Sequence, residues 1–328
     1  MGAGILVEDR FDLPEVPRLD IGYRLHPKNP DRAYYDERTD RNIGWITREE
    51  QEGLRREVIG IAGCGGMGAQ LAEKFLRLGV GELRICDTEV FDISNINRQF
   101  AATRKTVGKS KAFETAKMLR DVSDDSTVVV YPQGICRETV EQFTNGCSVI
   151  CDEIEFWAIA ARILLHQYAR GANVSVFNCN TVGFGTHLFL FTPKSATMEE
   201  MIGFTIEEAE ELNRRLREKT ARPEEVRLVM ERMIAGLVPE LPEYVSAQTP
   251  EGSNRKAVRK RLMEEGKASI IATNPPFATG FLADRVLLYL LRDSAVRRDI
   301  VPTPEAPAYL HIDAAKMEAR VVRQGTRL

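Results

Sequence analysis

The hydrophobic positions between residues 58 and 193 follow two alternating patterns. Short apolar runs are separated by longer segments in which apolar residues recur at helical spacing. Buried strands of a parallel sheet separated by amphipathic helices give this pattern, so we expect a doubly wound, Rossmann-like α/β fold with a mostly parallel sheet. The expected strands are 58–62, 83–86, 127–131, 148–151, 174–178 and 187–191. The expected helices are 66–78, 110–121, 140–144 and 156–170.

The flanking segments have different patterns. Residues 1–50 contain closely spaced prolines, which prevent a long helix, and they are expected to form an irregular N-terminal arm. The sequence from Thr47 to Glu50 has the form of a capping box and predicts a short helix that ends near Arg56. Two charge-rich helices with a narrow apolar stripe, 207–219 and 223–236, indicate a helical insertion.

The last segment returns to a mixed pattern. We expect a short apolar strand from Ser269, an apolar helix around Gly280, and a closing strand pair at 309–312 and 320–323. The chain therefore divides into an N-terminal arm (1–50), a Rossmann-like core (51–194), a helical insertion (195–267) and a C-terminal completion of the α/β domain (268–328). Residues 255–261 of the insertion are locally basic, which is typical of a solvated helix face but also fits contact with an acidic partner.

Composition excludes several classes of protein. Of the 328 residues, 43% are hydrophobic and 28% are charged, which is the composition of a globular protein and excludes overall disorder. The net charge of −3 argues against a general nucleic-acid binder. No apolar run approaches the roughly 18 residues that a membrane span needs, and the first ten residues lack the apolar stretch of a secretory signal. We therefore expect a cytoplasmic protein with no nucleic-acid or membrane partner.

A glycine-rich loop follows the first expected strand and opens a helix. Its sequence, Gly63-Cys-Gly65-Gly66-Met-Gly68, allows a tight turn and a close backbone approach, and the helix N-terminus offers free N–H groups to a phosphate. Asp87 ends the next strand, where an acidic residue binds ribose hydroxyls in dinucleotide sites. Nucleotide binding is favoured over a tight turn without a ligand, but the loop alone does not choose between NAD and ATP.

Two cations follow the glycine loop at a spacing that favours ATP. An enzyme that attacks the α-phosphate of ATP needs fixed positive charges, because negative charge accumulates on the phosphates as pyrophosphate leaves. Arg98 and Lys111 can supply them, whereas a dehydrogenase has no need of this pair. Either residue alone is better explained as a surface ion pair or a helix-face lysine. Together they favour phosphate chemistry.

These motifs resemble the ubiquitin-activating-enzyme-like adenylyltransferases, the ThiF, MoeB and HesA group. The resemblance covers residues 37–193 and, more weakly, 269–291. The loop matches the family's G-x-G-G-x-G, the run from Asp87 to Gln99 matches D-x-D-x-V-x-x-S-N-x-x-R-Q with Glu89 in place of the second aspartate, and Lys111 matches the lysine of G-x-x-K. Upstream, Arg38-Thr-Asp-Arg41-Asn42 resembles R-Y-x-R-Q.

The resemblance implies a role for each matched position. Arg98 and Lys111 would act on the phosphates, and Arg41 would reach into the ATP site of the partner subunit across a homodimer. The family's D-x-x-D-N reads here Asp152-Glu-Ile-Glu155-Phe156, so Glu155 would place Mg²⁺ with a carboxylate one methylene longer. The nucleotide-binding positions implied are Gly63, Gly65, Gly66, Gly68, Asp87, Glu89, Asn95, Gln99 and Asp152, with Asn95 on the phosphates.

The cysteines limit the chemistry further. The six cysteines form no Cys-x-x-Cys pair, so no structural zinc is expected. None follows Cys179, so a thioester in the segment beyond the ATP site is excluded, and Cys179 is the one weak candidate nucleophile. We therefore expect an enzyme that uses ATP and Mg²⁺ to activate a carboxylate as an acyl-adenylate. The resemblance implies that this is the C-terminus of a ubiquitin-like or sulfur-carrier protein, a peptide or a small acid.

Two other functions stay open from the sequence. An NAD-dependent oxidoreductase would use the same glycine loop, but no convincing acid–base constellation follows the first βαβ unit. A non-catalytic nucleotide-binding scaffold is favoured by the altered motif at residues 152–156.

Overall fold

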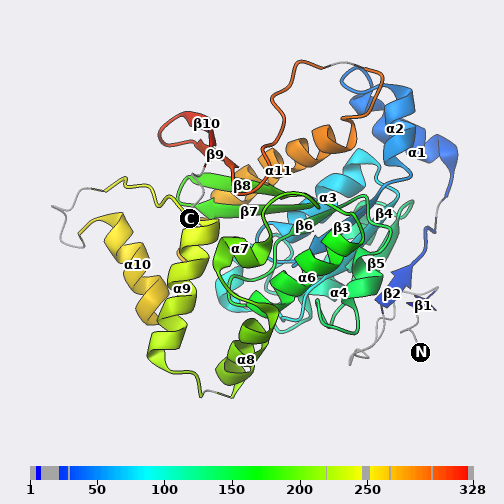
Figure 1. Ribbon diagram of the computed structural model, residues 1–328. Helices are drawn as coiled ribbons and strands as arrows, with labels where there is room; N and C mark the ends of the chain where they lie inside the picture. Colours follow the sequence, from blue (N-terminus) through cyan, green and yellow to red (C-terminus); the bar gives the residue numbers. More distant parts are fainter. Residues whose placement is uncertain are drawn as a thin grey trace.

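The computed structural model describes residues 5–8, 22–28, 30–218, 220–245, 252–265, 267–296 and 298–323. Within them, ten strands form one sheet in the order β1-β2-β5-β4-β3-β6-β7-β8-β9-β10 (Figure 1). Five neighbouring pairs are parallel, including every pair from β5 across to β7, and four are antiparallel. The predicted doubly wound, mostly parallel sheet is confirmed. The strands are β1 Ile5–Glu8, β2 Gly22–Leu25, β3 Val58–Ala62, β4 Glu82–Cys86, β5 Thr127–Tyr131, β6 Val149–Asp152, β7 Val176–Val182, β8 Gly185–Phe191, β9 Tyr309–Asp313 and β10 Glu318–Val322.

Helices cover both faces of the sheet. One apolar core lies between one face of the sheet and helices α3, α4 and α11, and a second lies between the other face and α5 to α9. The helices are α1 Arg32–Thr39, α2 Arg48–Leu54, α3 Gly68–Leu78, α4 Lys111–Val122, α5 Val140–Thr144, α6 Ile159–Gly171, α7 Met198–Ile202, α8 Ile206–Arg217, α9 Pro223–Leu237, α10 Asn254–Glu265 and α11 Asn274–Leu290. In Figure 1, α9 and α10 lie side by side at the end of the molecule opposite α1 and α2.

The order of the strands locates a crevice. Strands β3 and β6 are parallel neighbours, but the helix after β3 packs on one face of the sheet and the helix after β6 packs on the other. The two connections therefore diverge from the carboxyl ends of these strands. Open α/β sheets bind ligands at this switch point.

The structure differs from the sequence predictions in the flanking segments. The N-terminal arm is more regular than expected, because 22–25 joins the sheet as β2 and 32–39 forms α1, which begins at an Asp31 cap. No strand forms near Ser269, where 267–271 run as irregular chain before α11. The capping box at Thr47 and the closing strand pair are confirmed. Lys219, the expected end of one helix, lies outside the described residues. No helix of the described residues is both long enough and apolar enough to span a membrane.

Candidate functional site

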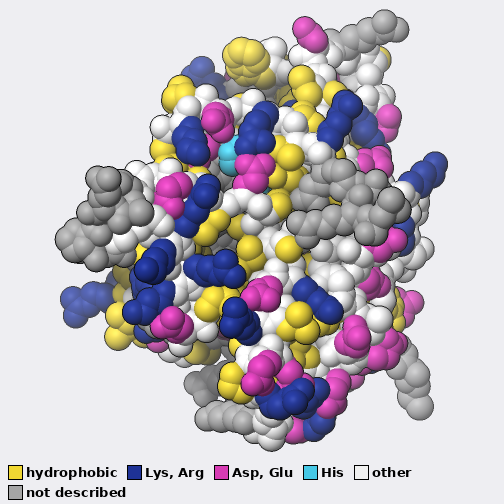
Figure 2. All heavy atoms as spheres, turned by 60° about the vertical axis from the view of Figure 1, so that its left-hand side comes forward, with side chains coloured by type: hydrophobic (Ala, Val, Ile, Leu, Met, Phe, Trp, Pro, Cys, Tyr) yellow, Lys and Arg dark blue, Asp and Glu magenta, His cyan; other side chains and the backbone are white. Residues whose placement is uncertain are grey.

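A large cavity opens at the carboxyl ends of β3, β4, β6 and β7. It has a volume of about 2040 Å³, whereas sites for small ligands occupy roughly 300–1,000 Å³. The glycine loop and the ends of the strands form one side, and α9, α10 and the β9–β10 hairpin form the other. The space-filling view shows a recess in this face bordered by Lys and Arg side chains (Figure 2).

The glycines of the loop divide into two functions. A Cβ on Gly68 would lie 1.8 Å from the Gly63 carbonyl oxygen, and Gly63 has φ +105° with its Cβ position 2.2 Å from the Glu153 carbonyl oxygen. These two glycines therefore allow the helix and the neighbouring strand end to pack closely. Gly65 and Gly66 line the cavity, and a Cβ added to either would have no contact closer than 3.5 Å. Gly68 itself is not part of the cavity wall and has a packing role, and its contact with the nucleotide stays a prediction.

The N-terminus of α3 faces this loop. Its cap residue, Met67, lines the cavity and makes no side-chain capping hydrogen bond. The first N–H groups of a helix lack partners within the helix, and the helix dipole is positive at this end. The loop and the helix start together form a site suited to phosphate oxygens.

Asp87 lies at the end of β4 and supports the loop directly. Its Oδ2 accepts the N–H of Cys64 at 2.8 Å, and its Oδ1 accepts the N–H of Glu89 at 2.8 Å. Burial raises the pKa of Asp87, while the nearby Lys111 ammonium opposes that shift. Each carboxylate oxygen accepts one of these N–H groups and can accept a second hydrogen bond, so the group can still accept a ribose hydroxyl.

Arg98 and Lys111 are both brought to the cavity wall. The buried Lys111 Nζ lies 2.5 Å from Oε2 of Glu89, which is exposed to solvent. Arg98 donates to the Ser94 carbonyl oxygen at 3.0 Å and to Asn97 Oδ1 at 2.9 Å rather than to a carboxylate. A bound phosphate would therefore take the place of the two neutral acceptors that Arg98 now donates to, and it would compete with the Glu89 carboxylate for the Lys111 ammonium.

The structure places the two amides predicted beside these cations, Gln99 and Asn95, in different environments. Gln99 is buried and lines the cavity, and its Oε1 has no hydrogen-bond partner among the described residues. Asn95 does not line the cavity. Its Oδ1 accepts the Asp92 N–H at 3.0 Å and so closes a capping box around the turn Ile93–Asn95. The Asn95 amide oxygen is thus used within the turn, and the prediction that Asn95 holds a phosphate stays a prediction.

Asp152 lines the cavity and also connects two elements of the scaffold. It is fully buried at the end of β6, and its Oδ2 lies 3.0 Å from both Arg162 Nε and His166 Nε2 on α6. Burial opposes its ionisation, but the Arg162 guanidinium and the hydrogen bond with His166 outweigh burial and lower the pKa of Asp152. Asp152 therefore links β6 to α6, and its predicted nucleotide-binding role stays a prediction.

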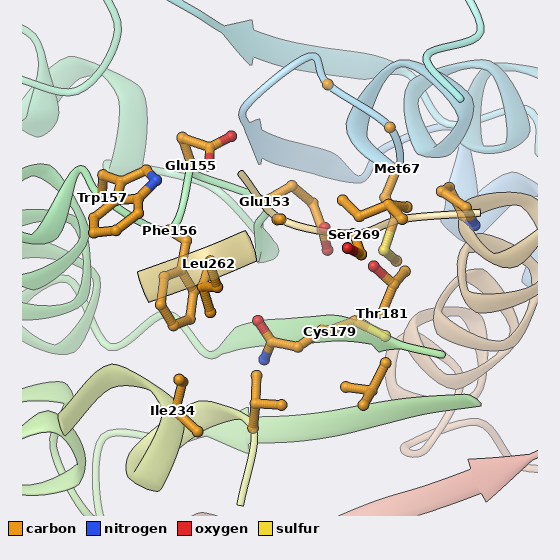
Figure 3. Close-up of a pocket in the computed structure, with 18 of the residues that line it drawn as sticks. Met67, Glu153, Glu155, Phe156, Trp157, Cys179, Thr181, Ile234, Leu262 and Ser269 are labelled. Atoms are coloured by element: carbon orange, nitrogen blue, oxygen red, sulfur yellow. The ribbon is translucent and has the colours of Figure 1, made fainter. Parts of the chain in front are cut away.

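The carboxylate aimed into the cavity is Glu153, which the sequence reasoning missed. Figure 3 shows its side chain extending toward Ser269 and Thr181, while the exposed Glu155 lines another part of the wall and points elsewhere. Glu153 Oε1 is buried without a partner among the described residues, and burial together with Asp152 raises the pKa of Glu153 well above its usual range. Side chains alternate in direction along a strand, so Glu153 is expected to point away from the side that Asp152 faces. This alternation is the signal in the sequence that could have identified Glu153.

Two further predicted residues, Arg41 and Cys179, contribute no reactive group to this cavity. Arg41 is exposed on the turn Asp40–Asn42 and does not line the cavity, so its action on a partner subunit stays a prediction. Cys179 lines the cavity but is buried, with Sγ 2.9 Å from Thr186 Oγ1, and burial raises the pKa of its thiol. A neutral thiol is a weak nucleophile. In the described part of the chain, no group of three or more His, Cys, Asp or Glu side chains could hold a metal ion.

Comparisons of the sequence with known proteins identify its family and related proteins. The model of the ThiF family matches residues 39–327. The tRNA threonylcarbamoyladenosine dehydratase of Bacillus subtilis is 34% identical over 113 residues, which is 34% of this chain and 44% of that protein. The mouse adenylyltransferase and sulfurtransferase MOCS3 is 33% identical over 99 residues, covering 30% of this chain and 22% of MOCS3. The matched region thus spans less than half of each of these two relatives.

Solved structures show the same fold. The crystal structure of E. coli MccB with ATP superimposes with a TM-score of 0.59 at 16% identity, over 92% of this chain and 74% of MccB. At this identity the likeness concerns the fold alone. It extends beyond the core of the sheet, because nearly the whole chain is covered.

Proposed function

The chain belongs to the ThiF family, and from this membership and the cavity geometry we propose that it is an ATP-dependent adenylyltransferase. It activates a carboxylate as an acyl-adenylate and releases pyrophosphate. The observation that carries the proposal is the meeting of the open glycine loop, Arg98 and Lys111 in the wall of one cavity. MccB, whose crystal structure holds ATP, has the same fold.

The geometry supports a consistent set of roles. The phosphates lie on the backbone of Gly65 and Gly66 and on the N-terminus of α3, while Asp87 accepts the ribose hydroxyls. The substrate carboxylate oxygen attacks the α-phosphorus, and the bond from that phosphorus to the bridging oxygen of pyrophosphate breaks. Arg98 and Lys111 stabilise the negative charge that accumulates on the leaving phosphates.

The carboxylates in the wall fit a magnesium ion carried by the nucleotide. Mg²⁺ takes one or two protein carboxylates together with phosphate oxygens and waters. Glu153 offers a buried oxygen without a partner among the described residues, and Glu155 is accessible in the same wall, whereas Asp152 is occupied by Arg162 and His166. We propose that Glu153 holds the ion, and the role of Glu155 in placing Mg²⁺ stays a prediction because its side chain points elsewhere. When bound, the ion neutralises charge on the phosphates.

The acyl group would leave the enzyme on a separate acceptor. No cysteine follows Cys179 in the sequence, and Cys179 itself is a buried, neutral thiol. The proposed substrates are the C-terminus of a ubiquitin-like or sulfur-carrier protein, a peptide or a small acid. We propose that the active form is a homodimer in which Arg41 of each subunit acts on the phosphates bound by the other.

Exchange of labelled pyrophosphate into ATP tests this function. Exchange should appear only with the correct carboxylate, and Arg98→Ala or Lys111→Ala should abolish it without changing the melting temperature. Arg104→Ala and Lys105→Ala are matched controls, because both residues are exposed on the same segment and neither lines the cavity. Full exchange in both cavity variants would contradict the site. ATP binding with no exchange for any carboxylate would favour a non-catalytic scaffold.

A further inference from the structure

The guanidinium of Arg162 connects two residues that flank Glu153 in the chain. Arg162 lies on α6 and is buried. Its Nε lies 3.0 Å from Oδ2 of Asp152, the residue before Glu153, and its Nη2 donates to the carbonyl oxygen of Ile154, the residue after it. A guanidinium holds two acceptors at once because its donors point in fixed directions within one plane. Arg162 therefore holds the chain on both sides of Glu153.

The backbone of Glu153 is also fixed by the glycine loop. Its N–H donates to the Ala62 carbonyl oxygen at 2.8 Å, and its own carbonyl oxygen would lie 2.2 Å from a Cβ added to Gly63. The Ile154 N–H donates to Asp152 Oδ1 at 3.1 Å and tightens the same turn. Glu153 Oε1 has no partner among the described residues, so the direction of this carboxyl depends on the backbone that carries it.

The direction of the Glu153 carboxyl matters because of the metal it is proposed to hold. Figure 3 shows the side chain extending toward Ser269 and Thr181, inside the cavity. Mg²⁺ demands near-ideal octahedral geometry, with ligand oxygens at about 2.0–2.1 Å. Residues that orient a metal ligand therefore affect metal affinity, typically by about 10–100-fold when they are removed.

His166 provides a comparison within the same cluster. It lies one turn after Arg162 on α6, and its Nε2 is 3.0 Å from the same Oδ2 of Asp152. Both His166 and Ile154 are described residues, and no hydrogen bond joins them. Loss of either α6 residue would take one partner from Asp152, but only loss of Arg162 would release the turn after it.

We propose that Arg162 is a positioning residue, which holds the turn from Asp152 to Glu155 so that the Glu153 carboxyl meets the magnesium of Mg·ATP. The proposal rests on the adenylation and on the magnesium role of Glu153 proposed above, and it names the residue on which that role depends. The alternative is a purely structural ion pair, in which Arg162 only neutralises Asp152. Arg162 and His166 would then affect stability alone.

The gain in nucleotide affinity that magnesium provides tests the proposal. Calorimetry with the full chain measures the Kd of the α,β-methylene analogue of ATP with excess Mg²⁺ and with a chelator, and the ratio of the two Kd values is the gain. Arg162→Lys keeps a cation beside Asp152, but one ammonium lacks the fork that reaches both acceptors. The gain should fall about tenfold or more, while the Kd without metal stays unchanged.

The matched control is His166→Phe. It removes the other partner of Asp152 and keeps an aromatic ring beside Phe191, so it should leave the gain unchanged. Should Arg162→Lys unfold, Asp152→Asn combined with Arg162→Gln removes both buried charges together and should lose the gain in the same way.

A double-mutant cycle shows whether Arg162 acts through Glu153. Glu153→Gln should itself lose most of the gain, because an amide replaces the carboxylate. Residues that act as one unit have non-additive effects, so adding Arg162→Lys to Glu153→Gln should produce no further loss.

Four results would overturn the positioning role: no gain from magnesium in the wild-type protein, a full gain in Arg162→Lys, an equal loss in His166→Phe, or fully additive effects in the cycle. Because the assay contains no carboxylate substrate, failure of the adenylation proposal is separable. A gain that depends on Arg162 without any pyrophosphate exchange would contradict adenylation alone. Exchange together with an unchanged gain in Arg162→Lys would contradict the positioning role alone.

Discussion

Two glycines that stand three residues apart should respond in opposite ways to the same substitution. In Gly68→Ala the new methyl group would lie 1.8 Å from the Gly63 carbonyl oxygen and 2.8 Å from its carbonyl carbon. Both atoms are backbone and have no rotamer that relieves the clash, so α3 must shift away from the loop. In Gly65→Ala the nearest atom would be Gln99 Nε2 at 3.7 Å, which is ordinary van der Waals contact.

The size of each effect follows from these contacts. Overpacking a close-packed site costs about 1–3 kcal/mol, and a backbone clash belongs at the upper end, so we expect a loss of about 3 kcal/mol for Gly68→Ala. At about 2–4 °C per kcal/mol this lowers the melting temperature by roughly 6–12 °C. Gly65→Ala should change stability by less than about 0.5 kcal/mol, because the site is open, while its methyl group occupies space reserved for phosphate.

Thermal unfolding with and without ATP separates the two glycines. Gly68→Ala should melt early in both conditions, and Gly65→Ala should melt like the wild-type protein without ATP but lose the stabilisation that ATP provides. Gly53→Ala is a control, because it also meets open space and lies in α2, outside the cavity. A Gly68→Ala protein that melts with the wild type would refute the argument, since it would show that the loop and helix start separate freely.

Three more predictions concern charge and buried polar groups. Hydrogen bonds from Arg298 lower the pKa of Glu50 from 4.5 to about 2, so the stability lost in Glu50→Gln should be greatest at neutral pH and should vanish as pH falls from 4.5 toward 2. Denaturant unfolding of both proteins across this pH range measures the loss. A difference in stability that persists in acid would contradict the prediction. Asp152→Asn should cost about 3–5 kcal/mol by denaturant unfolding, because it leaves buried Arg162 without its carboxylate; a loss below about 1 kcal/mol would speak against the link. Gln99→Leu should weaken ATP binding, measured by calorimetry, without lowering the melting temperature; unchanged affinity would remove Gln99 from the site.

Local pattern was sufficient for most of the sheet and for the glycine loop. Strand β3 and the helix that follows it are close in sequence, and a tight turn between them needs glycine wherever the backbones touch. The contact of Gly68 with Gly63 is one example, because the spacing of the glycines alone predicts a close backbone contact of this type. The flanking segments were harder, because β2 joins the rest of the sheet by pairing with β5, which lies more than a hundred residues later.

Motif matching was less reliable for individual side chains. Asn95 and Asp152 fit the family pattern in the sequence, yet one amide closes a turn and one carboxylate binds α6. Glu153 fits no position of that pattern and points into the cavity. A motif fixes which residue types occur together, but the direction of each side chain depends on partners brought in by packing.

The sequence by itself determined the alternation of strands and helices, the glycine loop and the two cations beside it, because these depend on contacts within one βαβ unit and the helix after it. Only the tertiary structure decided which carboxylate faces the cavity and what forms its far side. The cations of α10 stand more than a hundred and fifty residues after the glycine loop, and nothing in their local sequence distinguishes a solvated helix from a wall of the site. Such long-range placement results from burial of apolar surface throughout the chain, which no local pattern records.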